Sequence, residues 1–562
     1  MPNKLKDVQT TDKTHHPYIL EENVSILLKG TGLPIRVNVY RPKSEDLVPV
    51  LVTFGPYGKD VPYAVFNPNS FAEVNEKHKS QHSAWETPDP LYWTKNGYAV
   101  VRGDEAGIGQ SPGILDTLSR RTTEAFYELI EWSAEQTWSS GKVGLLGISY
   151  YAATQWKVAA LKPKGLSAIC PWEGLTDNYR DNARHGGILS NSFLRSWWDK
   201  QIKPHEYGVP GRAASGWCPD TIEGDLSEAE RSRSRRVMLE DTRSSSFRDD
   251  EYFASKEFDL SNVQVPVLSV ANWGGISLHL RGNIQGFIHA GSKFKYLRTI
   301  VGRHDLPFYY DDEVRVQKSW FDAWLKDDDR VGWTQKGKVP AVDLVLRKGN
   351  VGYNDPEAEK LYERRQEGEW PLARTQYTKF YLTPNGELTR SQAINKGKMS
   401  YRALGNIKDP NFISFFTAPF EHDTEITGHS VARLSISVTQ DLYGPMPSDI
   451  DVFVTLRYLG PDGREVHYTG TVGDPAPLAK GWLRATLRQV NKDHSKHRDW
   501  LPHRDYTSKD VLPVIQGEVY TMDVEIWPTT VIADQGGRIV FEVASGDTQG
   551  SGIFLHDDPE DR

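Results

Sequence analysis

The strongest constraint on this chain is an apolar run that ends in a serine and continues into a helix-forming segment. Lys142–Leu146 leads into Gly147-Ile148-Ser149, and Tyr150–Trp156 follows. A strand, a sharp turn with serine at its tip and a helix form a nucleophile elbow, which exposes the hydroxyl to a substrate. The pattern therefore predicts a serine nucleophile. Tyr151 stands where the usual motif has a second glycine, so an ordinary turn or helix cap is the alternative for this stretch alone.

Composition limits the class of protein. A chain of 562 residues predicts two or three domains. The net charge of −8 comes from 67 basic and 75 acidic residues without a basic block, which argues against nucleic-acid binding. The N-terminus lacks an apolar signal core and no run approaches the ~18 apolar residues of a membrane span, so we expect a cytoplasmic protein. Cys170 and Cys218 are too few for a disulfide framework or a cysteine metal site. Two buried thiols are expected, with a single disulfide between them as the alternative. No histidine or acidic pattern indicates a metal, and no cofactor is predicted.

Strands and helices alternate over residues 1–337, which predicts an α/β domain with a largely parallel, buried sheet. The alternation stops between about 177 and 255, where a mostly helical cap is expected. The expected helices are 122–135, Tyr150–Leu161 and 312–326. The expected strands of this domain are Asn23–Leu28, Ile35–Tyr40, Val48–Thr53, Tyr98–Arg102, Lys142–Leu146, Leu166–Cys170, Val265–Ala271 and Tyr296–Val301.

From residue 338 to 562 the pattern changes to short strand-like runs separated by turn signals such as Pro-Asn-Gly at 384–386. This texture predicts a separate antiparallel β domain, a sandwich or jelly roll. The expected strands are Val342–Leu346, Lys379–Leu382, Val431–Val438, Ile450–Tyr458, Tyr520–Ile526 and Arg538–Val543.

A serine nucleophile needs a base and oxyanion donors. In α/β-hydrolases the histidine follows the last strand of the sheet, and His304 directly follows Tyr296–Val301. His279 is the competing histidine and is expected on a helix. The backbone N–H of Tyr150 is one expected oxyanion donor, and the phenol of Tyr57, in the loop at 55–60, is the other. A packing role for Tyr57 is the alternative.

Several separated motifs resemble the cocaine-esterase and X-prolyl dipeptidyl-peptidase (CocE/NonD-like) hydrolases. They are Tyr40-Arg41-Pro42, Gly55-Pro56-Tyr57-Gly58-Lys59, Trp138–Gly144 with Gly147–Tyr150 and Gln155-Trp156, and Glu369-Trp370-Pro371. The resemblance implies an α/β-hydrolase domain with a helical cap, followed by a jelly-roll (galactose-binding-like) domain. It also implies Ser149 as nucleophile, and Tyr57 O–H and Tyr150 N–H as oxyanion donors.

The chain departs from that family at the catalytic acid. The family carries Gly-Trp-x-Asp after the strand that precedes the histidine strand, and here Trp273 is followed by glycine at the aspartate position, Gly275. Glu173 ends the neighbouring strand, so its carboxylate is predicted to face the same crevice and to replace the aspartate. Asp177 is the second choice for the acid, and Asp305 is expected to point elsewhere.

These observations predict a serine hydrolase that cleaves an ester or amide of a small molecule through an acyl-enzyme. An X-prolyl-type dipeptidyl aminopeptidase is a second possibility. A catalytically impaired binding protein is the third, motivated by Gly275. The residues expected to line the substrate pocket are Trp172, Trp197, Trp198 and Trp273.

Overall fold

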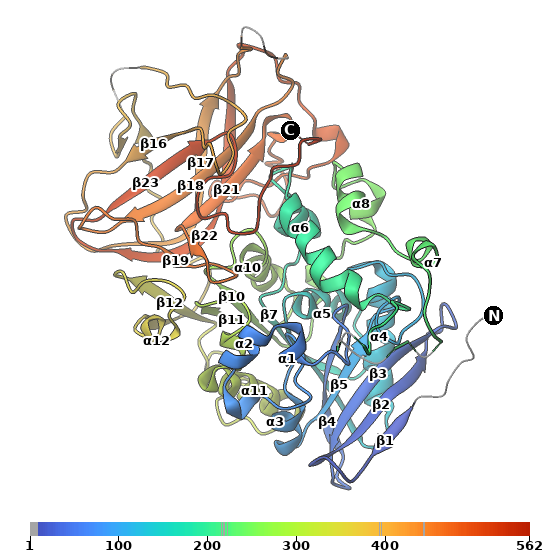
Figure 1. The fold of residues 1–562 in the computed structure, drawn as a ribbon. Helices are drawn as coiled ribbons and strands as arrows, with labels where there is room; N and C mark the ends of the chain where they lie inside the picture. Colours follow the sequence, from blue (N-terminus) through green and yellow to red (C-terminus); the bar gives the residue numbers. More distant parts are fainter. Residues whose placement is uncertain are drawn as a thin grey trace.

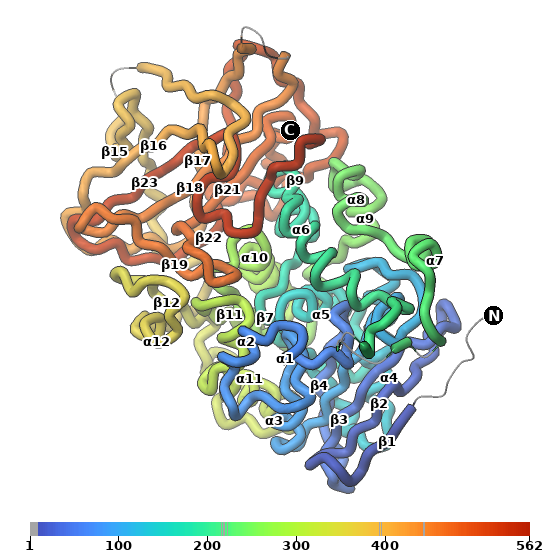
Figure 2. The backbone as a smooth tube through the Cα atoms, viewed as in Figure 1, coloured from blue at the N-terminus to red at the C-terminus, as the bar shows by residue number. Residues whose placement is uncertain are grey.

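The protein folds into an α/β domain with a helical cap and an all-β domain packed against it (Figures 1 and 2). The computed structural model describes residues 9–561 except 215, 217–219, 222, 393, 395, 442, 443 and 445. Cys218 therefore lies outside the described residues, and Cys170 is a free, buried thiol.

The α/β sheet has a parallel centre with antiparallel strands at both edges. Its order is β1-β2-β3-β5-β4-β6-β7-β10-β11-β12-β13, and the pairs from β5 to β12 are parallel. Parallel strands place their carboxyl ends at one edge, where ligands gather. The strands are β1 (Thr10–Asp12), β2 (Tyr18–Leu27), β3 (Pro34–Pro42), β4 (Val48–Gly55), β5 (Ala99–Asp104), β6 (Ser139–Ile148), β7 (Leu166–Trp172), β10 (Val267–Asn272), β11 (Lys295–Ile300), β12 (Val342–Lys348) and β13 (Glu363–Glu367).

Helices cover both faces of this sheet. Alternate residues of β5 lie in different hydrophobic clusters. Ala99 and Val101 belong to the cluster that includes α4, and Val100 belongs to the cluster on the other face, which includes α3 and α11. Burial on both faces explains why the strands are continuous apolar runs. The covering helices are α3 (Pro90–Lys95), α4 (Arg120–Glu135), α5 (Tyr150–Ala160), α10 (Leu280–His289) and α11 (Asp311–Leu325), and α1 (Tyr63–Phe66) and α2 (Pro68–Glu73) lie in the loop after β4.

The cap lies between β7 and β10 and is built of short helical segments (Figure 1). The C-terminal tail of the chain packs on it, since Arg184 Nη1 contacts Asp561 Oδ1 at 2.8 Å. The cap contains η2 (Tyr179–Ala183), the hairpin β8 (Arg184–His185) and β9 (Ile188–Leu189), α6 (Asn191–Trp197), η3 (Trp198–Ile202), η4 (Lys203–His205), α7 (Glu228–Arg233), α8 (Met238–Ser244) and α9 (Glu251–Ala254).

The β domain, orange to red in Figure 1, is an antiparallel sheet in the order β16-β23-β18-β21-β22-β17. Strand β12 pairs with β11 of the α/β domain and also with β22, so it joins the two sheets. The division at residue 337 stays a prediction, because this joining strand directly follows it. The strands are β16 (Phe412–Phe416), β17 (Thr424–Ile436), β18 (Asp451–Leu459), β21 (Ala479–Arg484), β22 (Tyr520–Ala533) and β23 (Arg538–Ala544), with the small pairs β14 (Tyr381–Leu382) and β15 (Leu388–Thr389), and β19 (Tyr468–Thr469) and β20 (Pro475–Ala476).

The expected fold class, an α/β domain followed by an all-β domain, is confirmed. Each strand expected in the first domain has a counterpart, and the helix expected at 150–161 is α5, which ends at Ala160. The β domain has only the four-residue helix α12 (Pro356–Glu359) and single-turn segments among its described residues. The jelly-roll assignment stays a prediction.

Candidate active site

Ser149 lies at the turn between β6 and α5, in a backbone conformation that non-glycine residues rarely adopt. Its φ is 62° and its ψ is −116°, and its C=O accepts hydrogen bonds from the N–H groups of Ala152 and Ala153, 3.0 and 2.8 Å away. Such a conformation costs about 1–3 kcal/mol and persists where the surroundings enforce it. The strained turn and the helix that starts immediately after it have the geometry of a nucleophile elbow.

Glycines on two strands make room for the tyrosine that stands in place of the usual second glycine. A Cβ on Gly147 would lie 2.7 Å from Tyr151 Cβ, and a Cβ on Gly55 would lie 2.6 Å from Tyr151 Cε1. Both distances are below real carbon–carbon contacts. In the usual motif, the second glycine lets the turn lie close to the neighbouring strands. Here Gly55 of β4 and Gly147 of β6 leave the space that Tyr151 needs at this turn.

The two residues expected to supply oxyanion donors, Tyr57 and Tyr150, line the same cavity as Ser149. The Tyr57 hydroxyl accepts a hydrogen bond from Trp197 Nε1 at 3.1 Å. Burial raises the pKa of Tyr57 well above its usual value, so the phenol keeps its proton and can donate. The N–H of Tyr150 belongs to the first turn of α5, where backbone donors have no partner within the helix. The Tyr150 hydroxyl donates to Glu105 Oε2 at 3.0 Å, which fixes the position of the side chain.

His304 and Glu173 form a buried pair at the carboxyl end of the sheet. The distance from His304 Nδ1 to Glu173 Oε2 is 2.9 Å, and Asn272 Nδ2 donates to Glu173 Oε1 at 3.1 Å. Glu173 is fully buried and has a φ of 51°. Asn272 also donates to the C=O of Gly302 at 2.8 Å, which ties the histidine loop to the end of β10. The carboxylate is thus oriented from two sides.

The glycine at the family's aspartate position lies beside the Glu173 carboxylate. A Cβ on Gly275 would lie 3.5 Å from Glu173 Oε2, so a side chain at 275 would be directed at the space that this carboxylate fills. Gly274 packs on the β domain, because a Cβ there would lie 1.9 Å from the C=O of Thr469. The backbone N–H of His304 donates a hydrogen bond to the C=O of Thr471 in the β domain, 3.0 Å away. The β domain therefore supports the loops that carry the site.

A second histidine contacts the serine. His279, the residue before α10, has its Nε2 3.1 Å from Ser149 Oγ, and its Nδ1 accepts the N–H of Leu175 at 3.2 Å. Burial, with His304 alongside, lowers the pKa of His279 well below its usual value, so the ring is neutral. A neutral ring that accepts at Nδ1 carries its proton on Nε2, and His279 therefore donates to Ser149. The His279 and His304 rings stack with centroids 5.1 Å apart.

Glu86 approaches the other side of His304. Its Oε1 lies 3.2 Å from His304 Nε2, and burial raises the pKa of Glu86 to about 7. Burial by itself lowers the pKa of His304, but Glu173 and Glu86 outweigh it and raise that pKa well above its usual value. In this structure the ring lies between two carboxylates, and the histidine that hydrogen-bonds Ser149 is His279 rather than His304.

Two family models together match most of the chain. The model described as X-Pro dipeptidyl-peptidase (S15 family) matches residues 31–304, and the model of the X-Pro dipeptidyl-peptidase C-terminal non-catalytic domain matches residues 333–562. The chain belongs to the CocE/NonD-like X-Pro dipeptidyl-peptidase family of serine hydrolases.

Some of its relatives match most of the chain. Cocaine esterase of Rhodococcus sp. is 24% identical over 94% of this chain and 91% of its own length. A putative serine esterase of Mycobacterium bovis is 23% identical over 83% of this chain and 81% of its own length. A CocE/NonD family hydrolase from Staphylococcus aureus has a solved structure that covers 99% of this chain and 94% of its own, with 25% identity and a TM-score of 0.81.

The other two carboxylates considered in the sequence have partners other than His304. Asp177 forms an ion pair with Arg180, and Asp305 bonds to Arg303 and Ser70. Of the four tryptophans expected to line the pocket, Trp197 lines the cavity at Ser149. The other three, which are buried but are not part of that lining, are Trp172, Trp198 and Trp273.

Sequence reasoning missed Glu86, Asn272 and the contact between His279 and Ser149. Glu86 lies in an irregular loop, where no periodicity marks it, and Asn272 reads as one more residue of β10. Only the position of Asn272 at the carboxyl end of a strand gave a signal.

Among the described residues, one group of side chains could hold a metal ion, and no helix could span a membrane. Across the described part of the chain, the side chains grouped closely enough to hold a metal are His494, His503 and Asp505, on a loop of the β domain. Within the same residues, no helix combines the length and the apolarity that crossing a bilayer requires.

Proposed function

We propose that this serine hydrolase cleaves small-molecule esters or amides through an acyl-enzyme on Ser149. His304 takes the proton of the serine hydroxyl and returns it to the leaving group, and Glu173 orients the imidazole and stabilises its charged form. Tyr57 O–H and Tyr150 N–H stabilise the oxyanion. Because His304 Nε2 faces Glu86 in this structure, the proposal includes a shift of that ring towards Ser149 when substrate binds.

One observation carries the assignment of the acid. The Glu173 carboxylate lies 2.9 Å from His304 Nδ1 and fills the space towards which a side chain at Gly275 would point. This geometry supports the proposal that Glu173, at the neighbouring strand end, takes the role of the family's aspartate. The competing carboxylate, Asp177, is engaged by Arg180.

The lining of the cavity favours a short, uncharged acyl group. The cavity at Ser149 has a volume of about 30 Å³, and no Asp, Glu, Lys or Arg lines it within the described residues. Besides Ser149 and His279, its walls are Tyr57, Leu118, Tyr150, Ala153, Leu175, Asn182, Phe193, Trp197, Met238 and Leu278. An X-prolyl aminopeptidase needs an anionic subsite for the α-amino group of its substrate. The walls offer no carboxylate for it, so an ester is the better candidate.

The triad acid is tested by Glu173→Gln. The amide keeps the side-chain volume but cannot stabilise the imidazolium, so we expect kcat for a p-nitrophenyl ester to fall roughly 10^4-fold. Asp177→Asn is the matched control, with near-normal kcat. A Glu173→Gln protein with native circular dichroism and full ester turnover would falsify the role of Glu173.

A swap of the acid tests whether positions 173 and 275 serve the same ring. The positive φ of Glu173 suits glycine, so Glu173→Gly removes the carboxylate without backbone strain. Adding Gly275→Asp returns a carboxylate to the position used by the family. We expect the double variant to hydrolyse the ester faster than Glu173→Gly alone. Equal rates would mean that a carboxylate at 275 cannot serve His304.

The pH dependence of kcat/KM should report the carboxylates around His304. The base must be neutral, and both carboxylates stabilise its protonated form, so the acidic limb is expected above the usual histidine pKa. Glu86→Gln removes one of them and should move the midpoint to lower pH. Glu76→Gln, an acid-to-amide change at an exposed position of the same loop, should leave it in place. An unmoved midpoint in Glu86→Gln would remove Glu86 from the electrostatics of the base.

A further inference from the structure

A second cavity lies where the cap, helix α10 and the β domain meet. Its volume is about 130 Å³, and none of its lining residues is shared with the cavity at Ser149. A single water needs about 10–15 Å³ measured in this way, so the space accepts a small solute. The cap contributes Arg180 and Arg248, α10 contributes Gln285, and a loop of the β domain contributes Lys496 and Arg504.

The charge of this cavity is predominantly positive, although the whole chain is acidic. Each lining carboxylate is already neutralised by an arginine: Asp177 by Arg180, Glu257 by Arg248 and Glu525 by Arg281. The six basic side chains that line the cavity, against these three carboxylates, are Arg180, Arg248, Lys256, Arg281, Lys496 and Arg504.

Two of the basic groups retain uncompensated charge. Lys496 forms no ion pair with any described carboxylate, and the same holds for Arg504, whose guanidinium donates to the backbone C=O groups of Arg488 and Asp523. Desolvation lowers the pKa of Lys496, and Arg180 and Arg248 lower it further, while Asp177 and Asp259 act in the opposite direction.

Helix α10 directs unpartnered polar atoms at the same cavity. Arg281, Gln285 and His289 are spaced four residues apart, so they share one face of the helix. Gln285 is only 8% exposed, and its Nε2 has no hydrogen-bond partner. The buried Nε2 of His289 also lacks a hydrogen-bond partner. A buried polar atom without a partner costs free energy, which a ligand that accepts hydrogen bonds would remove.

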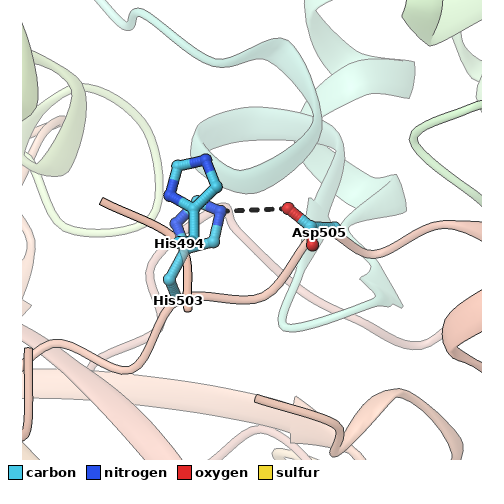
Figure 3. A group of neighbouring side chains, drawn as sticks. All are labelled: His494, His503 and Asp505. Atoms are coloured by element: carbon cyan, nitrogen blue, oxygen red, sulfur yellow. Dashed lines mark hydrogen bonds and ion pairs between the residues drawn. The ribbon is translucent and has the colours of Figure 1, made fainter. Parts of the chain in front are cut away.

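The histidine cluster at the rim favours an anion over a metal ion. His503 Nε2 bonds Asp505 Oδ1 at 3.1 Å, and the His494 and His503 rings are stacked, with centroids 3.7 Å apart and planes 6° apart (Figure 3). The lone pairs of nitrogen lie in the ring planes, so two parallel stacked rings do not converge on one ion. Desolvation lowers the pKa of both histidines, and the positive charge of Arg180 lowers it further, a charge that also disfavours a divalent cation beside the rings.

We propose that this cavity binds a small multivalent oxyanion, such as a phosphate or polycarboxylate group. Lys496 and Arg504 supply the charge, and Gln285 supplies an amide donor. His289 supplies its Nε2 as a donor when the proton is on that nitrogen. The site is independent of the ester chemistry, because its residues belong to neither the serine cavity nor the histidine pair.

Thermal unfolding of the full chain tests the proposal with inorganic phosphate as the probe. A ligand that binds the folded state raises Tm in a saturable way. We expect phosphate to raise Tm beyond the effect of sodium chloride at matched ionic strength. Parallel titrations with glycerol 3-phosphate and with citrate identify the class of ligand. Tighter binding of glycerol 3-phosphate would indicate a phosphate ester, and tighter binding of citrate would indicate a polycarboxylate.

Variants locate the binding site. Lys496 is exposed, so Lys496→Gln is expected to keep the fold. The double variant Lys496→Gln/Gln285→Leu should bind phosphate about tenfold more weakly than the wild type. Lys492→Gln makes the same charge change on the same loop outside the cavity and should leave binding unchanged. The proposal is overturned if phosphate acts only as sodium chloride does or if Lys492→Gln weakens binding equally. A metal site would replace the proposed anion site if Zn²⁺ raises Tm, if His503→Ala removes that effect, and if phosphate does not raise Tm.

Discussion

Ser149→Ala is expected to abolish ester hydrolysis, with kcat lower by about 10^6-fold, the loss measured when the nucleophile of a serine protease is removed. Only the hydroxyl at the tip of the elbow can form the acyl-enzyme. The wild-type protein should be labelled covalently by a fluorophosphonate probe, and peptide mass spectrometry should place the label on Ser149. The variant should lose the label together with the activity.

The control for this experiment is Ser167→Ala, which removes a half-buried hydroxyl that bonds only the C=O of Gly165. Its activity and labelling should match the wild type. An unlabelled but folded wild-type protein would contradict the nucleophile assignment and favour a binding protein that kept the family's architecture. Labelling that persists in Ser149→Ala would assign the reactive hydroxyl to another residue.

Residues at the ends of strands were accessible to sequence reasoning. Parallel strands deliver their carboxyl ends to one edge, so Ser149 after β6, Glu173 after β7 and His304 after β11 had to lie near one another. The structure brings Glu173 and His304 to 2.9 Å, and their catalytic roles stay predictions. The vacancy at Gly275 was visible because a family motif fixed which residue to expect there.

Residues that reach the site from irregular segments were not accessible. Glu86 comes from a loop between β4 and β5, and its approach to His304 depends on how that loop packs. The rotation of α10 decides that His279 faces Ser149, and one residue of difference in the helix start would turn the ring away by about 100°. The second cavity combines the cap, α10 and the β domain, so no local pattern indicates it.

The two histidines are separated by a paired substitution. His304→Ala removes the proposed base and should lower kcat about 10^6-fold, as removal of the histidine does in a serine protease. His279→Gln keeps an N–H donor near the position of Nε2, so we expect a loss of about tenfold, the cost of a displaced hydrogen bond. Circular dichroism and Tm of both variants check that the protein remains folded when one ring of the buried histidine stack is replaced.

The order of the two effects decides which ring is the base. The tautomer of His279 follows from its Nδ1, which accepts the N–H of Leu175 and leaves the proton on the nitrogen that faces Ser149. A nitrogen that already carries a proton cannot accept another from the serine. His279→Gln should therefore also retain the acidic limb of the pH profile, which belongs to His304. If His279→Gln is as inactive as His304→Ala and loses that limb, His279 is the base, and His304 with its two carboxylates serves to position it.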